Sequence, residues 1–467
     1  MNTRSLAATA PFAAPAARYL LPAGAAVGAA RRALAAGWLW LAVASLVGSG
    51  LFSILLVLSR APYVKDVFPL AGFFRVALIV HVDLSVLVWL AAFGGLLWTL
   101  NGSARFLALG WAGLALCAAG TLALCAAPFL EEGLPVMSNY VPVIDGPIFL
   151  HGLAVFAAGV ALLVLRAMLC AQRVGIRPDG AAALRFGVNA AAVSAAVALF
   201  AFGWSYLALP GSLEGRAYFE VLFWGGGHVL QFTWTLLMFV AWLALAEASG
   251  ARAPLSPRIA LLLFAIALAS VFATPVLYLA YDLVSVEHYR MQTWLMRIGG
   301  GLAIVPFAAA VLLGLAAAPR ASAEARPLRA ALIWSVALFG AGGVIGLAIN
   351  GSNVKIPAHY HGAIVGVTLA FMGLAYHLLP GLRFARPHAR LAAWQPALYG
   401  SGQLLHIAGL VWSGGYGVQR KLGGSEQALR SVSEIAGMGL MGVGGVLAVA
   451  GGILFIAIVL RAMLARR

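Results

Sequence analysis

The chain has 467 residues, of which 63% are hydrophobic and only 9% are charged. A water-soluble domain of this size does not show this balance, so the composition excludes a soluble enzyme and indicates a protein whose main solvent is the lipid bilayer. The formal net charge is +16, but the basic residues lie at the edges of apolar stretches rather than in one run. Membrane topology therefore explains them better than nucleic-acid binding does.

The first 35 residues are rich in alanine, are interrupted by proline and contain a few arginines. They lack the compact apolar core that precedes the cleavage site of a targeting peptide. We therefore predict a flexible cytoplasmic tail over 1–35. The remainder, 36–467, has no internal repeat and no long linker, and we predict a single membrane domain there.

A helix needs about 20 apolar residues to cross the hydrocarbon core of a bilayer. Twelve stretches of the chain meet this requirement, and most connections between them are short. The stretches lie near 36–58, 74–100, 106–128, 147–170, 186–209, 218–246, 258–283, 293–318, 328–350, 357–380, 392–413 and 436–463. The sequence therefore predicts an all-α integral membrane protein with twelve transmembrane helices.

The charges between the spans predict the orientation. Arginines gather before the first span and in the loops that follow the even-numbered spans, whereas the loop between the third and fourth spans carries Glu131, Glu132 and Asp145 and has no lysine or arginine. Positively charged loops stay on the cytoplasmic side of a membrane. We therefore expect a multi-pass protein with both termini in the cytoplasm.

Nine histidines are candidates for function, because an ionisable side chain inside a bilayer is costly and needs a partner. Taken singly, each is more often a hydrogen-bonded structural residue. With the predicted topology, His81 and His228 lie roughly 10 to 15 Å below the outer surface at about 1.5 Å per residue. His288, His359 and His361 come at the outer ends of their spans, so five histidines are expected in one layer.

His359 and His361 form the most informative pair, since only Tyr360 separates them. Residues two apart on a helix differ by about 200° and point to opposite sides. One helix can therefore ligate two different cofactors. Two unrelated polar contacts are the commoner explanation of such a pair, but the matching depth of His81 and His228 favours cofactors.

At these positions the sequence resembles the haem-copper oxidase superfamily, which includes subunit I of cytochrome c oxidases and the large subunit of nitric oxide reductases. The resemblance covers all twelve spans and implies a bundle like cytochrome c oxidase subunit I, with two haems and a second metal. It implies that His81 and His361 are the axial ligands of a low-spin haem and that His359 ligates a high-spin haem. His228, in the segment WGGGHVLQFTW, would bind the second metal.

Three charged residues are further candidates. Arg420 and Lys421, in YGVQRKLGG, stand where the family often has a basic pair that holds haem propionates; the alternative is ordinary loop charge. Glu220 lies eight residues before His228, close to two turns away on the same face. It is a candidate proton relay from the outer aqueous phase, or else an interfacial glutamate.

One departure from the family concerns the second metal. The seventh helix of the family normally ends with adjacent histidines, whereas this chain reads YDLVSVEHYRMQTW, with His288 alone. We expect Asp282, Glu287 or Tyr289 to complete the site, and two histidines with a carboxylate favour non-haem iron over copper. The alternative is that the seventh span ends earlier and that His288 is a surface loop residue.

A second departure concerns a tyrosine. Four residues after His228, where many oxidases have a tyrosine and nitric oxide reductases a glutamate, this chain has Phe232. Oxidases of the cbb type place the tyrosine in the seventh helix, six residues before the first histidine of the pair. Tyr281 stands six residues before Glu287 and is therefore a candidate catalytic residue.

The resemblance implies the catalytic subunit of a respiratory terminal reductase in a bacterial inner (plasma) membrane. Reduction of NO to N2O needs only two electrons and no tyrosine cofactor, so Phe232 and a carboxylate-bearing metal site favour NO as the acceptor. Reduction of O2 to water, as in a cytochrome c oxidase, is the alternative. A twelve-helix secondary transporter is a distant alternative, because the related halves typical of transporters are not seen.

The cysteine pattern indicates how the haems are held and where the electrons come from. Cys117, Cys125 and Cys170 have no metal-ligand spacing, and the chain has neither a CxxCH haem-attachment motif nor a paired-cysteine copper motif. The haems would therefore be non-covalent, and electrons would come from a cytochrome c or from a copper- or haem-containing donor subunit.

The remaining histidines are assigned by position. His151 and His406, near the outer ends of their spans, are expected near haem propionates. His377 and His388 lie on the cytoplasmic side, far from the predicted ligands, and are expected to be structural.

Overall fold

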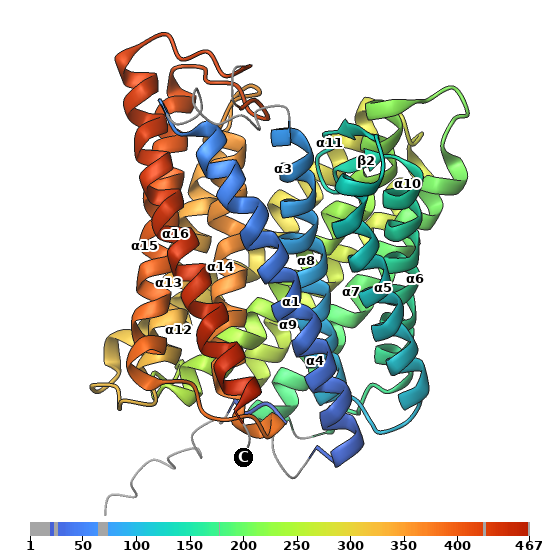
Figure 1. Ribbon diagram of the computed structural model, residues 1–467. Helices are drawn as coiled ribbons and strands as arrows, with labels where there is room; N and C mark the ends of the chain where they lie inside the picture. Colours follow the sequence, from blue (N-terminus) through green and yellow to red (C-terminus); the bar gives the residue numbers. More distant parts are fainter. Residues whose placement is uncertain (1–18, 23–26, 64–72, 177, 424–425, 466–467) are drawn as a thin grey trace, which may run out of the picture.

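The computed structural model describes residues 19–22, 27–63, 73–176, 178–423 and 426–465. Long helices run side by side in one bundle, with short connections at its two ends (Figure 1). The elements are, in chain order, α1 (Ala29–Arg60), α3 (Phe74–Val82), the π-helical turn η3 (Asp83–Val88), α4 (Trp89–Asn101), α5 (Leu107–Leu130), β1 (Leu134–Val136), β2 (Val143–Asp145), α6 (Pro147–Leu169), α7 (Gly180–Ala208), α8 (Gly215–Ala248), α9 (Pro257–Val271), α10 (Ala273–Ala280), α11 (Val286–Leu295), the π-helical turn η4 (Met296–Gly300), α12 (Gly301–Ala317), α13 (Arg326–Leu347), α14 (Lys355–Leu378), the 3₁₀ turn η5 (Pro380–Leu382), α15 (Ala389–Gly415) and α16 (Val432–Leu464).

These helices make twelve crossings of the bundle within the described part of the chain, as the sequence predicts. Eleven of them are long and apolar enough to span a bilayer, and three of the eleven are composite: α3–η3–α4, α9–α10 and α11–η4–α12. The twelfth crossing is α15, a helix of 27 residues whose interior includes Gln395, Gln403 and His406. The protein is therefore an all-α multi-pass membrane protein, and the predicted fold class is confirmed.

The N-terminal boundary differs from the prediction. α1 begins at Ala29, inside the segment that the sequence assigned to a tail over 1–35. Tyr19 is 2% exposed, and its hydroxyl donates to the backbone carbonyl of Leu255 at 2.7 Å. A buried phenol needs a hydrogen-bond acceptor, and the Leu255 carbonyl provides it. Tyr19 is therefore part of the packed structure. Residues 1–18 and 23–26 of the predicted tail lie outside the described residues.

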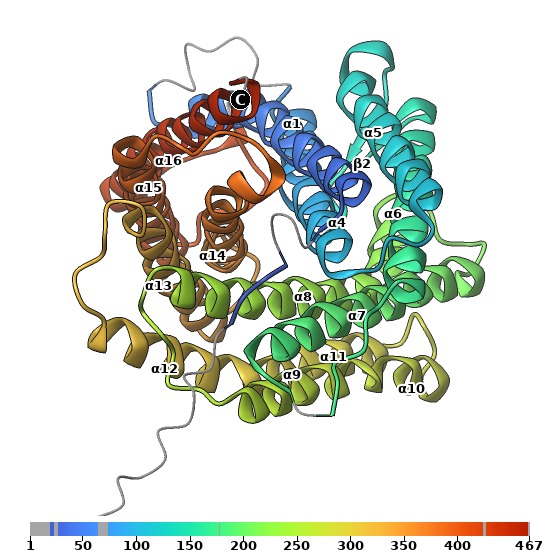
Figure 2. The same ribbon diagram turned by 90° about the horizontal axis from the view of Figure 1, so that it is seen from below.

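The most buried crossings carry the predicted ligands. Among the eleven apolar crossings, α3–η3–α4, α8 and α14 have the largest buried share. Seen along the bundle, α14 lies inside an arc of α13, α15, α16 and α8, whereas α5 and α6 lie at the periphery (Figure 2). Phe93 of α4 stacks on Phe371 of α14 with ring centroids 4.4 Å apart. Polar groups on these helices are therefore shielded from lipid.

Glycines set the closest approaches between helices, as is common where lipid removes the hydrophobic drive for helix association. α13 meets α14 at Gly342 and Gly362, and a Cβ atom on Gly342 would lie 2.3 Å from the backbone nitrogen of Ala363. α15 meets α16 in the same way, since a Cβ atom on Gly409 would lie 2.4 Å from the backbone nitrogen of Met441. These two seams fix α14 and α15 against their neighbours.

Two π-helical turns interrupt the crossings that hold His81 and His288. η3 begins two residues after His81, and η4 begins directly after the helix α11 that carries His288. Such turns are rare and frequently occur at functional sites. They redirect the side chains that follow them, which a sequence pattern based on 3.6 residues per turn does not anticipate.

A small antiparallel hairpin, β1 with β2, connects α5 to α6 at the upper end of the bundle in Figure 1. Glu131 fixes the base of the hairpin, because the Glu131 carboxylate accepts hydrogen bonds from the backbone amides of Ile148 and Phe149 at 2.7 and 2.9 Å. A carboxylate at a helix N-terminus is favourable because it satisfies free N–H groups and complements the helix dipole. At its tip, the Ser138 hydroxyl donates to the Val141 carbonyl.

The glycine seam between α13 and α14 gives a test of the packing. We expect Gly342→Ala to destabilise the protein by about 1–3 kcal/mol, because the added methyl group meets backbone atoms that cannot move aside. Gly343→Ala, on the same helix, meets nothing within 4 Å and should leave stability unchanged or slightly raised. Thermal unfolding of the two purified variants in detergent measures the difference, and equal midpoints would contradict this account of the seam.

Candidate haem and metal site

The pair predicted for the low-spin haem is held through Nδ1. Nδ1 of His81 lies 3.0 Å from both the carbonyl and the hydroxyl oxygen of Ser49 on α1. Nδ1 of His361 lies 3.2 Å from Oε1 of Gln403 on α15. A carbonyl oxygen only accepts, so each Nδ1 carries the proton and each Nε2 keeps its lone pair.

The other member of the His-x-His pair faces a different helix. Nδ1 of His359 donates to the backbone carbonyl of Gly342 on α13 at 2.7 Å, whereas His361 is bonded to α15. The two side chains thus point to different sides of α14, as their spacing predicts. Gly346 leaves the space for the His359 ring, since a Cβ atom there would lie 2.7 Å from Nδ1.

These three histidines fit the role of axial haem ligands. A metal-binding histidine typically donates from one ring nitrogen to a carbonyl or similar acceptor and binds the metal through the other. His81, His359 and His361 share this arrangement, and in the described part of the chain their Nε2 atoms make no hydrogen bond. The donor set therefore suits haem iron, with the Nε2 atoms as the ligands.

A third imidazole lies beside His361. The ring of His406 on α15 is 4.6 Å from the ring of His361, and its Nδ1 donates to the carbonyl of Met441 on α16 at 3.0 Å. The ring of His406 thus lies directly against a predicted axial ligand. Its contact with a haem propionate stays a prediction.

His228 on α8 is buried, and both of its ring nitrogens are engaged. Nδ1 lies 2.8 Å from the carbonyl of Trp224, one turn earlier, and Nε2 lies 3.0 Å from the hydroxyl of Tyr140. Because the carbonyl only accepts, Nδ1 carries the proton and Tyr140 donates to Nε2. Burial raises the pKa of Tyr140 well above its ordinary value, so the phenol keeps its proton.

Three consecutive glycines before His228 explain how Tyr140 reaches it. A Cβ atom on Gly227 would lie 2.2 Å from Cγ of Tyr140, and one on Gly225 would lie 2.2 Å from the hydroxyl oxygen of Tyr278. Both tyrosines therefore pack directly on the backbone of α8. The glycine motif is visible in the sequence, but the sequence pattern does not predict that Tyr140 of the hairpin loop packs on it.

The segment predicted to complete the metal site divides into buried and exposed residues. Ser285 caps α11, and His288 in its first turn is 1% exposed, which rules out a surface loop position. Its imidazole forms no hydrogen bond of acceptable geometry among the described residues. Asp282 and Glu287 are exposed, and Tyr281 is half-buried at the end of α10.

This arrangement does not bring the predicted ligands into one cluster. Within the described residues, no three histidine, cysteine or acidic side chains are placed to hold a metal ion together. The assignment of Asp282 and Glu287 as ligands stays a prediction, which their exposure does not favour. His288 packs edge-on against Tyr278 with ring centroids 4.7 Å apart, and Tyr278 packs on the backbone of Gly225, three residues before His228.

The predicted propionate pair lies in a basic pocket of about 420 Å³ at the upper end of the bundle. Arg75, Arg216, Arg420 and Lys421 line it, and Arg75 is paired with Glu426 at 2.9 Å. Burial, together with the charges of Arg420 and Arg216, lowers the pKa of Lys421 to about 8. A pocket that holds several cations favours an anionic group, so it fits carboxylates such as propionates.

Glu220 lies near the first turns of α8 and contacts the hairpin. Its carboxylate accepts a hydrogen bond from the side-chain amide of Asn139, the residue before Tyr140. The predicted proton relay is thus joined to the loop that reaches His228. A role in proton transfer stays a prediction.

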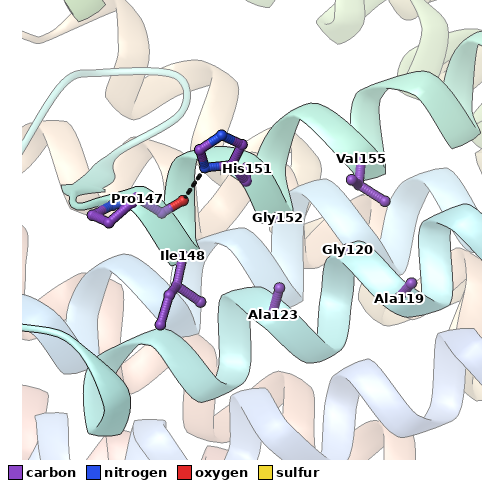
Figure 3. Close-up of a pocket in the computed structure, with 8 residues that line it drawn as sticks. All are labelled: Ala119, Gly120, Ala123, Pro147, Ile148, His151, Gly152 and Val155. Atoms are coloured by element: carbon purple, nitrogen blue, oxygen red, sulfur yellow. Dashed lines mark hydrogen bonds between the residues drawn. The ribbon is translucent and has the colours of Figure 1, made fainter.

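The other histidines lie away from this site. His151 is on an exposed groove between α5 and α6, where its Nδ1 donates to the carbonyl of Pro147 at 2.6 Å (Figure 3). The groove is mostly apolar and contains none of the predicted ligands, so the propionate contact expected of His151 stays a prediction that this position does not favour. His388 caps α15 by accepting from the amide of Leu391, which is a structural role.

Histidines that converge from the most buried helices of a twelve-crossing bundle define a membrane protein of the haem-copper oxidase class. Residues 33–454 match the family described as cytochrome C and quinol oxidase polypeptide I. The chain belongs to this family, and the predicted superfamily is confirmed. Membership implies an oxidoreductase.

The chain is also similar to individual proteins. An uncharacterized protein of Rickettsia prowazekii (strain Madrid E) is 28% identical over 493 residues, covering 91% of this chain and 94% of that protein. An uncharacterized protein of Aquifex aeolicus (strain VF5) is 27% identical over 354 residues, covering 74% of this chain and 85% of that protein. A cryo-EM structure of a heme-copper terminal oxidase dimer matches with a TM-score of 0.68 at 16% identity, covering 94% of this chain and 85% of that one, and it shows the likeness of fold.

The contact between Gln403 and His361 gives a test of the low-spin site. We expect Gln403→Leu to shift the low-spin haem spectrum and to weaken haem retention by about 10–100-fold, because the acceptor that orients His361 is lost. Gln395→Leu, on the same helix but bonded to Tyr376 at 3.1 Å, should leave that spectrum unchanged. Optical spectra of the purified variants measure this, and equal shifts in both would indicate a general packing effect.

Proposed function

We propose that this chain is the catalytic subunit of a respiratory terminal reductase that passes electrons from a low-spin haem to a high-spin haem beside a second metal. The observation that carries the proposal is the shared Nδ1 arrangement of His81, His359 and His361, which leaves three Nε2 atoms as iron ligands on the most buried helices. Bound haems would supply the redox chemistry. The chain supplies their ligands and excludes lipid from them.

Both histidines of the His-x-His pair lie on α14. His361 and His359 belong to the same helix and face α15 and α13. One rigid element would therefore hold both haem irons at a fixed separation. His228 lies on α8, which packs against α14, and offers the ligand for the second metal, non-haem iron or copper.

The electron donor must be another polypeptide, a cytochrome c or a copper- or haem-containing subunit, because the chain carries no motif for a donor centre of its own. We place the protein in a bacterial inner membrane with both termini in the cytoplasm. The charge distribution of the loops supports this orientation, and α1 starts at the same end of the bundle at which α16 ends (Figure 1).

We propose NO as the acceptor, reduced to N2O. The support is Phe232, which puts a hydrocarbon ring one turn after His228, within an apolar cluster with Ala198, Val229 and Val271. A two-electron reaction does not require a tyrosine at that position. The exposed carboxylates of α11 and its preceding loop add no support.

O2 is the second candidate acceptor, and one observation favours it. The hydroxyl of Tyr140 lies 3.0 Å from Nε2 of His228, so a phenol is present at the metal site although it comes from the α5–α6 loop. A redox-active phenol would serve a four-electron reduction. Tyr281, the tyrosine expected from sequence, is farther along the chain and only half-buried.

Histidine variants test the haem assignment. We expect His81→Ala or His361→Ala to abolish the low-spin haem signal, because iron loses an axial ligand, while His228→Ala keeps that signal and lowers turnover by more than about 100-fold. His388→Ala is the control, since His388 caps the start of α15, at the end of the bundle opposite the predicted ligands. Reduced-minus-oxidised spectra with and without carbon monoxide measure the haems, and unchanged spectra in all variants would overturn the assignment.

The acceptor is tested by turnover of the purified protein with a reduced donor and either gas. We expect N2O production from NO to exceed O2 consumption, because Phe232 stands at the position on α8 where a phenol is expected for O2 chemistry. Gas electrodes measure both rates on the same preparation, with His228→Ala as the background. Faster O2 consumption would assign the chain to the oxidases.

A further inference from the structure

The chain contains the tripeptide Asn-Gly-Ser twice, beginning at Asn101 and at Asn350. When glycine follows asparagine, the backbone nitrogen of the glycine can attack the side-chain amide of the asparagine, because no Cβ atom hinders the approach. The attack needs a glycine nitrogen that is not engaged in a hydrogen bond and a backbone that can move. The tripeptide is the same at both places, so a difference in their reactivity must come from the structure.

The first asparagine–glycine pair is locked into the end of a helix. Asn101 is the last residue of α4 and is 4% exposed, and its side-chain amide donates to Oδ1 of Asn189 at 2.9 Å. The backbone nitrogen of Gly102 donates to the carbonyl of Trp98 at 2.9 Å. This nitrogen is released only when the end of α4 opens, which costs free energy in a packed region. The first pair is therefore protected.

The second asparagine–glycine pair lies in the connection between α13 and α14. Asn350 and Gly351 are both exposed, and a Cβ atom on Gly351 would meet nothing within 4 Å. Within the part of the chain that the structure describes, the backbone nitrogen of Gly351 makes no hydrogen bond. The φ angle of Gly351 is +72°, in the left-handed region, which glycine enters and leaves easily. The nitrogen and the amide that it would attack are therefore both accessible.

A charge that arises at Asn350 would have defined neighbours. Nζ of Lys355, in the first turn of α14, donates to Oδ1 of Asn350 at 3.4 Å. Ser352 lines the basic pocket at the upper end of the bundle together with Arg420 and Lys421. A carboxylate in place of the Asn350 amide would be attracted to Lys355. It would also add a negative charge beside this pocket.

We propose that Asn350 is a site of spontaneous deamidation, at which the chain modifies itself without an enzyme or a cofactor. The Gly351 nitrogen forms a bond to Cγ of Asn350, the bond from Cγ to the amide nitrogen breaks, and ammonia leaves with the proton that Gly351 gives up. Water then opens the cyclic imide at either of its two carbonyls, which gives aspartate or isoaspartate. Isoaspartate adds a methylene group to the main chain ahead of α14, the helix of His359 and His361.

The test is peptide mass spectrometry of the full chain, purified in detergent and incubated in mildly alkaline buffer. We expect the Asn350 peptide to convert at least about tenfold faster than the Asn101 peptide, because the latter reacts only when the end of α4 opens. Gly351→Ala should slow conversion at Asn350 by at least about tenfold, because a methyl group hinders the attack and disfavours a positive φ. In the denatured chain the two peptides should convert at similar rates, since both contain Asn-Gly-Ser.

The outcomes decide the proposal without reference to haem, donor or turnover, so they are independent of the proposed function. Conversion at Asn350 with Asn101 intact, slowed in Gly351→Ala, supports it. An Asn350 peptide that stays unconverted in the folded chain overturns it, and so do equal rates at the two sites in the folded chain. Unchanged conversion in Gly351→Ala also overturns it, because the attacking atom would then not be the Gly351 nitrogen.

Discussion

A histidine inside a helix bundle has two ring nitrogens. The acceptor that takes a hydrogen bond from one of them leaves the other with a free lone pair. In this protein Nδ1 of His81, His359, His361 and His406 is bonded to an oxygen on a neighbouring helix, α1, α13, α15 and α16 respectively. Each bond satisfies a polar group that would be costly in lipid. Each also fixes a tautomer and ties two helices together, so the contacts that stabilise the bundle also leave each Nε2 without a proton.

The positions of these histidine rings therefore depend on how closely their helices pack. The glycine seam of α13 and α14 sets the distance at which Gly342 accepts from His359, and the seam of α15 and α16 sets the position of His406 against His361. His228 is the exception, because its Nδ1 is held within its own helix. Its remaining nitrogen is then available to a group from outside, which is Tyr140.

Much of this arrangement was predictable from sequence because it depends on apolar length and helical spacing. The twelve crossings and the divergence of His359 and His361 both follow from such patterns. The approach of Tyr140 to His228 did not, since it requires a loop to fold back over a helix 88 residues later. The exposure of Asp282 and Glu287 also escaped prediction, because the start of α11 is set by a cap at Ser285 rather than by hydrophobicity.

The low apolarity of α15 has a consequence for how the protein enters the membrane. A helix that carries buried glutamines and a histidine is recognised weakly by the translocon, which selects segments by hydrophobicity. Its partner α16 is strongly apolar and fits it closely along a line of glycines. The two helices are therefore expected to insert as one hairpin, which brings Gln403 and His406 to His361 only after α14 is in the membrane.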